Sequence, residues 1–343
     1  MEAKGTARNS SIDIFRYICA IMVVSIHVKP FYQLSDRLSF WVSDVWARLA
    51  VPFFFAVAGY YYISKLEQDR APLLPYLKRL LPTYVKWSLV YYLVQILVGG
   101  EFLDFKDFVG KALFRFVFTG SYYHFWFFPG LIFSVCLTTL LFRIGWKKAL
   151  IPLSIILYGV GCLGSPYRAI GTRIPILGSM FMWKDYELVA RVLFIGFPYF
   201  VCGYVVRQIE RRCAGVSIKR IYKMTIAAVV IWLSEIFVLR KLGWRPDAVI
   251  SLGQYLVIVV ILLVLLRNPL PKYRSLANGC RSLANFTFYA HCLFAILIYE
   301  LRNQVPQFQP TAMEAFCMVV GLTFVLGLLF HRANRKHLNW LIN

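Results

Sequence analysis

The first long apolar segment of the sequence, residues 11–31, contains the ionisable residues Asp13, Arg16 and His27. A neutral imidazole can accept a proton near neutral pH, and a guanidinium can hold a phosphate with paired N–H donors. Arg16 and His27 are eleven residues apart, which is about three helical turns, so on a helix they share one face about 16.5 Å apart along the axis. Ionisable groups inside membrane spans are costly and usually face a cavity. We therefore predict a functional stripe that faces the interior of a helix bundle.

Each of these residues also has a structural interpretation. Arg16 can anchor the helix at the cytoplasmic interface and pair with Asp13 at i,i+3. His27 alone can be a satisfied polar residue in a helix contact. The face that Arg16 and His27 share favours the functional interpretation.

Membrane helices must position this stripe. Hydrophobic residues make up 59% of the chain, charged residues only 16%, and the mean hydropathy is +0.63, whereas soluble domains contain about 25% charged residues. Most apolar runs are about 17 to 22 residues long, enough to cross a hydrocarbon core of about 30 Å. They lie at 12–33, 45–64, 80–99, 125–142, 149–164, 188–206, 219–239, 248–266, 285–301 and 312–331. We predict an all-α fold: a polytopic membrane helix bundle of about ten transmembrane helices.

The connections between these runs complete the predicted organisation. The net charge is +22, and Lys and Arg gather in short clusters between apolar runs, which indicates membrane flanks and not nucleic-acid binding. More of them lie at the two ends and in the even-numbered loops, so both termini are predicted to be cytoplasmic. Residues 103–118 are expected to form an interfacial amphipathic piece, and 165–187 the longest outer loop without an obvious helix. We expect one membrane domain, 1–343, with no appended soluble domain.

The eight cysteines lie mostly inside apolar runs, with no CxxC pair and no histidine at metal-ligand spacing. We therefore expect neither a disulfide framework nor a metal site. The oligomeric state cannot be read from the sequence.

Four segments together resemble the acyltransferase-3 family of bacterial integral membrane proteins. They are Ile12-Asp13 with Arg16 and His27, then RLAVPFFFAVAGY at 48–60, YHFWFF at 123–128 and LANFTFYAH at 283–291. The length and the ten-helix count also match. One departure is that the family commonly has Ser-Gly-Tyr where this chain has Ala58-Gly59-Tyr60.

The resemblance implies an enzyme, an O-acyltransferase of the bacterial cytoplasmic (inner) membrane, most often an O-acetyltransferase. The donor substrate is cytoplasmic acyl-coenzyme A such as acetyl-CoA, with no permanently bound cofactor. The acceptor is a hydroxyl of a cell-envelope glycan or a lipid-linked sugar. The family also includes the membrane modules of vancomycin-resistance serine racemases, which are thought to move serine. A membrane carrier of an amino acid such as serine, or of acyl groups, is therefore the alternative, and a membrane scaffold is a third possibility.

Acyl transfer from a thioester needs a base for the acceptor hydroxyl and an anchor for the donor. With the resemblance, His27 is expected to be the catalytic base and Arg16 to hold the coenzyme A phosphates. Direct transfer and a transient acyl-histidine both stay open.

The other candidate residues surround these two. Lys78 and Arg79 are expected to assist acyl-CoA binding, or to anchor the helix. Arg48, Tyr123, His124 and Trp126 are the candidates for acceptor binding. An interfacial arginine would explain Arg48 equally well, and an aromatic belt would explain Tyr123 and Trp126, but a belt does not require His124. Asp13, His291 and Glu300 are candidate supporting residues, and Glu235 or Glu300 could hold His291.

Overall fold

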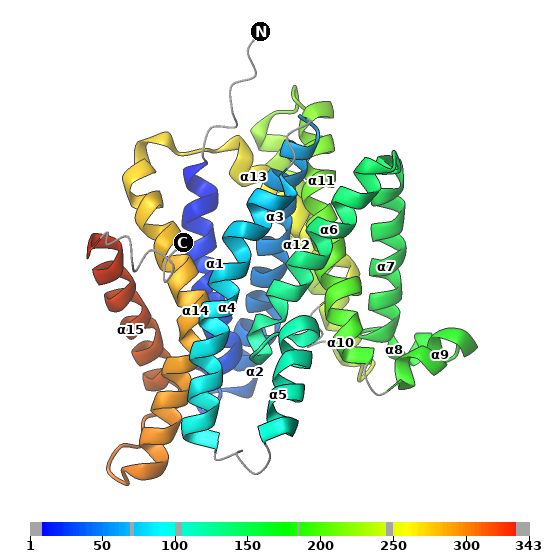
Figure 1. Cartoon of the computed structure of the whole chain (residues 1–343). Coiled ribbons are helices and arrows are strands. Elements are labelled where there is room, and N and C mark those ends of the chain that lie inside the picture. Colours follow the sequence, from blue (N-terminus) through cyan, green and yellow to red (C-terminus); the bar gives the residue numbers. More distant parts are fainter. Residues whose placement is uncertain (1–8, 69–71, 100–104, 184–185, 245–249, 334–343) are drawn as a thin grey trace.

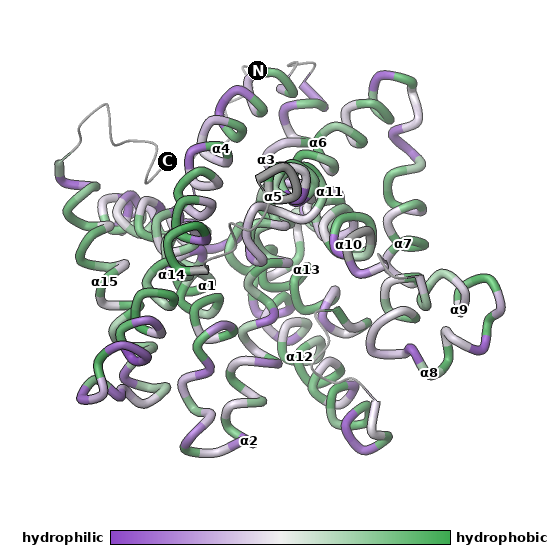
Figure 2. The backbone as a smooth tube through the Cα atoms, turned by 60° about the horizontal axis from the view of Figure 1, so that its bottom comes forward, coloured by the Kyte–Doolittle hydropathy of each residue, from purple (hydrophilic) through white to green (hydrophobic). Residues whose placement is uncertain are grey.

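The computed structural model describes residues 9–68, 72–99, 105–183, 186–244 and 250–333. Every regular element within these ranges is a helix, and the long helices stand side by side as a bundle (Figure 1). Hydrophobic residues follow the helices, while hydrophilic residues gather at helix ends and connections (Figure 2). The predicted all-α membrane bundle is therefore confirmed.

The long helices are α1 (Ser10–Val28), α3 (Ala50–Leu66), α4 (Leu73–Gly99), α6 (Phe127–Arg143), α7 (Leu150–Gly164), α11 (Phe197–Arg212), α12 (Ile218–Lys241), α13 (Leu252–Arg267), α14 (Arg274–Gln304) and α15 (Ala312–Ala333). Shorter helices are α2 (Asp36–Ser39), α5 (Phe105–Phe114), α8 (Arg168–Gly171), α9 (Pro175–Met182) and α10 (Tyr186–Ala190). Short π-helical or 3₁₀ turns are η1 (Phe40–Val45), η2 (Trp46–Leu49), η3 (Arg115–Thr119), η4 (Tyr123–Trp126), η5 (Lys147–Ala149), η6 (Arg191–Gly196) and η7 (Pro271–Tyr273).

All ten predicted apolar runs overlap these helices, although residues 248–249 of the eighth run lie outside the described residues. Within the described residues, eight helical segments are long and apolar enough to cross a membrane. The other two runs lie on α13, which is apolar but only 16 residues long, and on α4, which spans 27 residues and contains Lys78, Arg79 and Lys86. The start of α1 and the end of α15 lie at the same end of the bundle (Figure 1), as an even number of crossings requires. Which membrane side this end faces stays a prediction.

Two connections can be compared with their predictions. The described part of 103–118 is helical, as expected, in α5 and η3. The expectation of a helix-free connection at 165–187 is wrong, because it contains α8, α9 and the start of α10. These helices are only four, eight and five residues long, so they lack the several turns of periodic pattern that identify a helix from sequence.

Both ends of α1 are fixed. At its start, Asn9 caps the helix by accepting a hydrogen bond from the Ile12 amide, and its side-chain amide donates to the Leu265 carbonyl at 2.9 Å. At its end, Lys29 adopts a left-handed conformation with φ 49°, and Pro30 follows. His27 therefore lies in the last turn of a helix whose termination is set by the backbone.

Close contact between α3 and α11 forms the centre of the bundle. A Cβ on Gly59 would lie 1.8 Å from the Phe200 carbonyl oxygen, and one on Gly203 would lie 2.1 Å from the Ala56 carbonyl oxygen. The two backbones touch because neither glycine has a side chain, which is the packing mode that small residues permit between membrane helices.

Candidate active site

The face of α1 that carries Arg16 and His27 packs against α14. The Arg16 guanidinium donates to the Asn285 side-chain oxygen at 3.2 Å and lies 3.9 Å from the Asp13 carboxylate. Farther along, the His27 ring stacks on the His291 ring, with centroids 5.2 Å apart. The predicted shared face is therefore confirmed, and both of its residues contact α14 inside the bundle.

Three histidines and a tyrosine converge around the last turn of α1. The edge of the Tyr123 ring meets His27 with centroids 4.7 Å apart, and His124 meets His291 at 4.9 Å. His124 and His291 are buried. The first and ninth apolar runs of the sequence and the residues directly before the fourth run thus contribute to one cluster.

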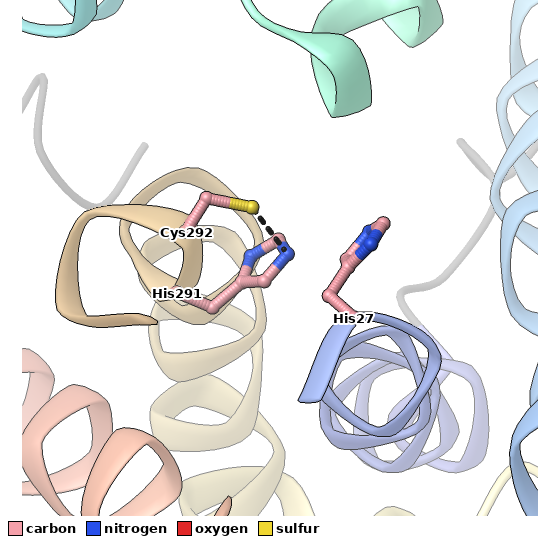
Figure 3. Close-up of side chains that lie close together, drawn as sticks. All are labelled: His27, His291 and Cys292. Atoms are coloured by element: carbon pink, nitrogen blue, oxygen red, sulfur yellow. Dashed lines mark hydrogen bonds between the residues drawn. The ribbon is translucent and has the colours of Figure 1, made fainter. Parts of the chain in front are cut away.

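His291 is held in a defined orientation. Its Nδ1 lies 3.0 Å from both the Thr287 and the Phe288 carbonyl oxygens. Since both neighbours are acceptors, Nδ1 carries the proton and Nε2 presents a lone pair. That Nε2 faces the Cys292 Sγ at 3.1 Å (Figure 3). The Cys292 Sγ also lies 3.3 Å from the Tyr123 hydroxyl oxygen.

A cavity of about 400 Å³ adjoins this cluster. Tyr123 and Cys292 form part of its wall, so the cavity reaches the groups that contact His27 and His291. Its lining also includes Arg115, Tyr299 and Glu300, beside apolar residues of α4 and α14. The cavity thus offers both charges and apolar walls to a bound molecule.

Basic residues of α4 lie near the other end of the stripe. Arg16 and Arg79 are both close enough to the Tyr76 and Tyr289 hydroxyls to act on them electrostatically, and Arg79 lies over the Tyr76 ring at 5.5 Å. Lys78 is exposed next to Arg79. Positive charge therefore gathers where Arg16 meets α14.

Arg48 lies on the opposite flank of His27. It is close enough to the imidazole to act on it electrostatically, and it lies 3.6 Å from Asp44. Asp44 also binds Lys29, at 3.2 Å. A salt-bridge group thus borders the end of α1, which makes Arg48 a neighbour of the histidine cluster.

Two candidate residues lie apart from the imidazoles. Trp126 packs beside Phe55 of α3, with ring centroids 5.7 Å apart. Glu300 lines the cavity, but the contacts of His291 Nδ1 are carbonyls of its own helix. A carboxylate is therefore not what orients His291.

Glu235 has a structural contact instead. Its carboxylate accepts hydrogen bonds from the Leu252 and Gly253 amides at 2.8 and 2.6 Å, at the start of α13, and from the Tyr167 hydroxyl. Burial and this carboxylate raise the pKa of the Tyr167 phenol above its usual value. Glu235 thus fixes the start of α13 to α12.

Sequence reasoning missed three features of the site. Asn285 and Cys292 are ordinary small side chains in an apolar pattern, and only the packing of α14 on α1 shows what they contact. Arg115 lies in η3, where its charge is typical of an interfacial helix. The one available signal was that Cys292 directly follows His291.

A family model described as an acyltransferase domain matches residues 9–336. The chain belongs to the acyltransferase-3 family. The match covers all ten predicted runs, including each of the four segments on which the resemblance rested.

Curated proteins that are similar in sequence to this chain are named as racemases. An amino-acid racemase from Enterococcus faecalis is 27% identical over 339 residues, which cover 96% of this chain and 47% of that protein. A serine/alanine racemase from Enterococcus gallinarum is 31% identical over 215 residues, which cover 60% of this chain and 30% of that protein. The chain thus spans less than half the length of these relatives. No solved structure matches it.

Proposed function

We propose that this acyltransferase-3 protein is an O-acyltransferase, most simply an O-acetyltransferase, of a bacterial cytoplasmic membrane. It would move an acyl group from cytoplasmic acyl-CoA to a hydroxyl of a cell-envelope glycan or lipid-linked sugar. The observation that carries this proposal is the alignment of Arg16 and His27 along α14, with His27 beside the wall of a cavity.

The proposed binding site for the acyl-CoA donor is formed by the basic residues Arg16, Arg79 and Lys78. Coenzyme A carries several phosphate charges, and guanidinium groups bind phosphate oxygens in pairs. Among the described residues Arg16 makes one hydrogen bond, to Asn285, although a guanidinium has five N–H donors. This supports a role for Arg16 in holding the coenzyme A phosphates while the pantetheine arm extends toward His27.

The chemical step assigned to His27 is general base catalysis. Its neutral imidazole accepts the proton of the acceptor hydroxyl as the oxygen attacks the thioester carbonyl, the C–S bond breaks, and the proton passes to the departing coenzyme A thiolate. The Tyr123 hydroxyl lies on the cavity wall, where it could donate to the developing oxyanion. His291 positions His27 through its ring contact, and His124 in turn contacts the His291 ring.

The cavity is the proposed acceptor site. Tyrosine rings suit the faces of a sugar, and Arg115 and Glu300 can bind its hydroxyl or phosphate substituents. Arg48 borders the same end of α1 and is proposed to bind an anionic acceptor group. With the amino terminus inside, as proposed, this end of the bundle faces outward.

A second candidate function is a membrane carrier for an amino acid such as serine. It is favoured by the names of the relatives, one of which is a serine/alanine racemase. In a carrier, Arg16 and His27 would line a translocation path without thioester chemistry.

The two functions differ in what they consume. Purified protein in proteoliposomes with radiolabelled acetyl-CoA and a bacterial envelope-glycan extract should release free coenzyme A and label the glycan. Serine uptake by the same proteoliposomes, without coenzyme A release, would support the carrier and contradict the acyltransferase.

A further inference from the structure

We propose that His27, His291 and Cys292 form a binding site for a zinc ion. Their ligand atoms all lie within 4.8 Å of one another (Figure 3). His27 comes from α1 and the other two residues from α14, so the site joins two helices that are far apart in sequence. The proposal concerns direct metal binding and does not depend on acyl transfer.

The distances suit a zinc ion after a small movement. Zinc binds nitrogen at about 2.0–2.1 Å and sulfur at about 2.3 Å, so tetrahedral ligand atoms lie about 3.3–3.6 Å apart. His291 Nε2 and Cys292 Sγ are 3.1 Å apart. A rotation of the half-buried His27 side chain toward these two atoms would complete the three-ligand set.

The hydrogen bonds of His291 are those of a metal ligand. Zinc-binding histidines usually donate their other ring N–H to a carbonyl or carboxylate, which fixes the tautomer and aims the lone pair. Here the Thr287 and Phe288 carbonyls fix the proton on Nδ1, and Nε2 points to Cys292. This arrangement leaves the Nε2 lone pair beside the Cys292 Sγ, as a zinc ligand requires.

The ligand chemistry selects a soft or borderline cation. Two imidazoles and a thiolate favour zinc over magnesium and calcium, which prefer oxygen ligands. Binding replaces the thiol proton by a sulfur–zinc bond and releases that proton. Cys292 lines the cavity of about 400 Å³, which provides an entry path and room for a water as fourth ligand.

Zinc at this site would block the reaction proposed above. A His27 nitrogen that binds zinc cannot accept a proton, and the ion would occupy the inner wall of the cavity. This consequence rests on the proposed function, whereas the binding itself does not. We therefore expect reversible zinc inhibition of acyl transfer, relieved by a chelator.

The first experiment measures zinc bound to the purified full-length chain in lipid nanodiscs. We expect one equivalent of zinc, and an X-ray absorption spectrum with a single sulfur neighbour at about 2.3 Å beside nitrogen neighbours. This measurement uses the unchanged protein, so no folding defect can affect it. The absence of a sulfur neighbour, or zinc no higher than in empty nanodiscs, would overturn the proposal.

Matched variants then locate the ligands. Cys292→Ser and His291→Gln should each weaken zinc binding about tenfold or more. Cys280→Ser changes another buried cysteine of α14, and His331→Gln a histidine of α15, and both should bind zinc as the unchanged chain does. Equal loss in the Cys292 and Cys280 variants would contradict the assignment. If zinc binds as expected but acyl transfer is absent, the proposed function fails and the metal site stands.

Discussion

Replacing Arg16 by Gln should weaken acyl-CoA binding, and the whole loss should come from the contacts of Arg16 with the phosphates. The substitution keeps a polar side chain with an N–H donor but removes the cation. A hydrogen bond to a charged group contributes about 1.5–3 kcal/mol. Because 27% of the Arg16 side chain is exposed, solvent screening favours the lower part of this range, about 1.5–2 kcal/mol. At about 1.4 kcal/mol per factor of ten, the Kd for acetyl-CoA should rise about 10- to 30-fold.

The assay compares two donors with the same thioester. Binding and initial rates are measured for acetyl-CoA and for S-acetylpantetheine, which lacks the phosphates, with purified protein in nanodiscs. Arg16→Gln should weaken acetyl-CoA and leave S-acetylpantetheine nearly unchanged, and Arg16→Lys should fall between because it keeps the charge but loses the paired donors. Arg220→Gln is the matched control, since Arg220 is an exposed cation at the start of α12. Equal weakening of both donors would refute the assignment of Arg16 to phosphate.

Further predictions concern packing, anchoring and the cavity. Gly59→Ala should lower the Tm because its Cβ would meet the Phe200 carbonyl. Gly279→Ala has open space around its Cβ, so the Tm should stay the same or rise. Both Tm values can be measured by heating the protein and monitoring the remaining folded fraction by size-exclusion chromatography. Glu235→Ala should also lower the Tm, by removing the carboxylate that accepts from the α13 amides, and an unchanged Tm would contradict that role. Tyr123→Phe should lower kcat more than it raises the KM for acetyl-CoA, if its hydroxyl donates to the oxyanion.

The sequence pattern was sufficient to predict the long helices and the shared face of Arg16 and His27 on α1. Ten continuous apolar runs of about membrane length predicted helices, because a helix satisfies its own backbone groups in a bilayer and barrel strands are shorter and alternate in polarity. The spacing of Arg16 and His27 fixed their common face because eleven residues make about three helical turns. The short helices α8 and α9 were missed because so few turns leave no periodic signal.

The partners of the stripe depend on which helices pack together, and local pattern does not contain that information. Nothing in the spacing along one helix shows that α14 lies against α1, so Asn285 and Cys292 could not be placed. Glu235 and Glu300 are both acids in apolar surroundings. Only their contacts show that Glu235 caps α13 and that Glu300 lines the cavity.

The central claim is that His27 is the base of an acyl transfer. The most direct test is coenzyme A release from acetyl-CoA by membranes that contain either the unchanged chain or His27→Gln, with a bacterial envelope-glycan extract as acceptor. Loss of a general base lowers rates about 10²- to 10⁴-fold, and we predict a loss in that range with the Kd for acetyl-CoA unchanged. Full activity in the His27→Gln variant would contradict the account.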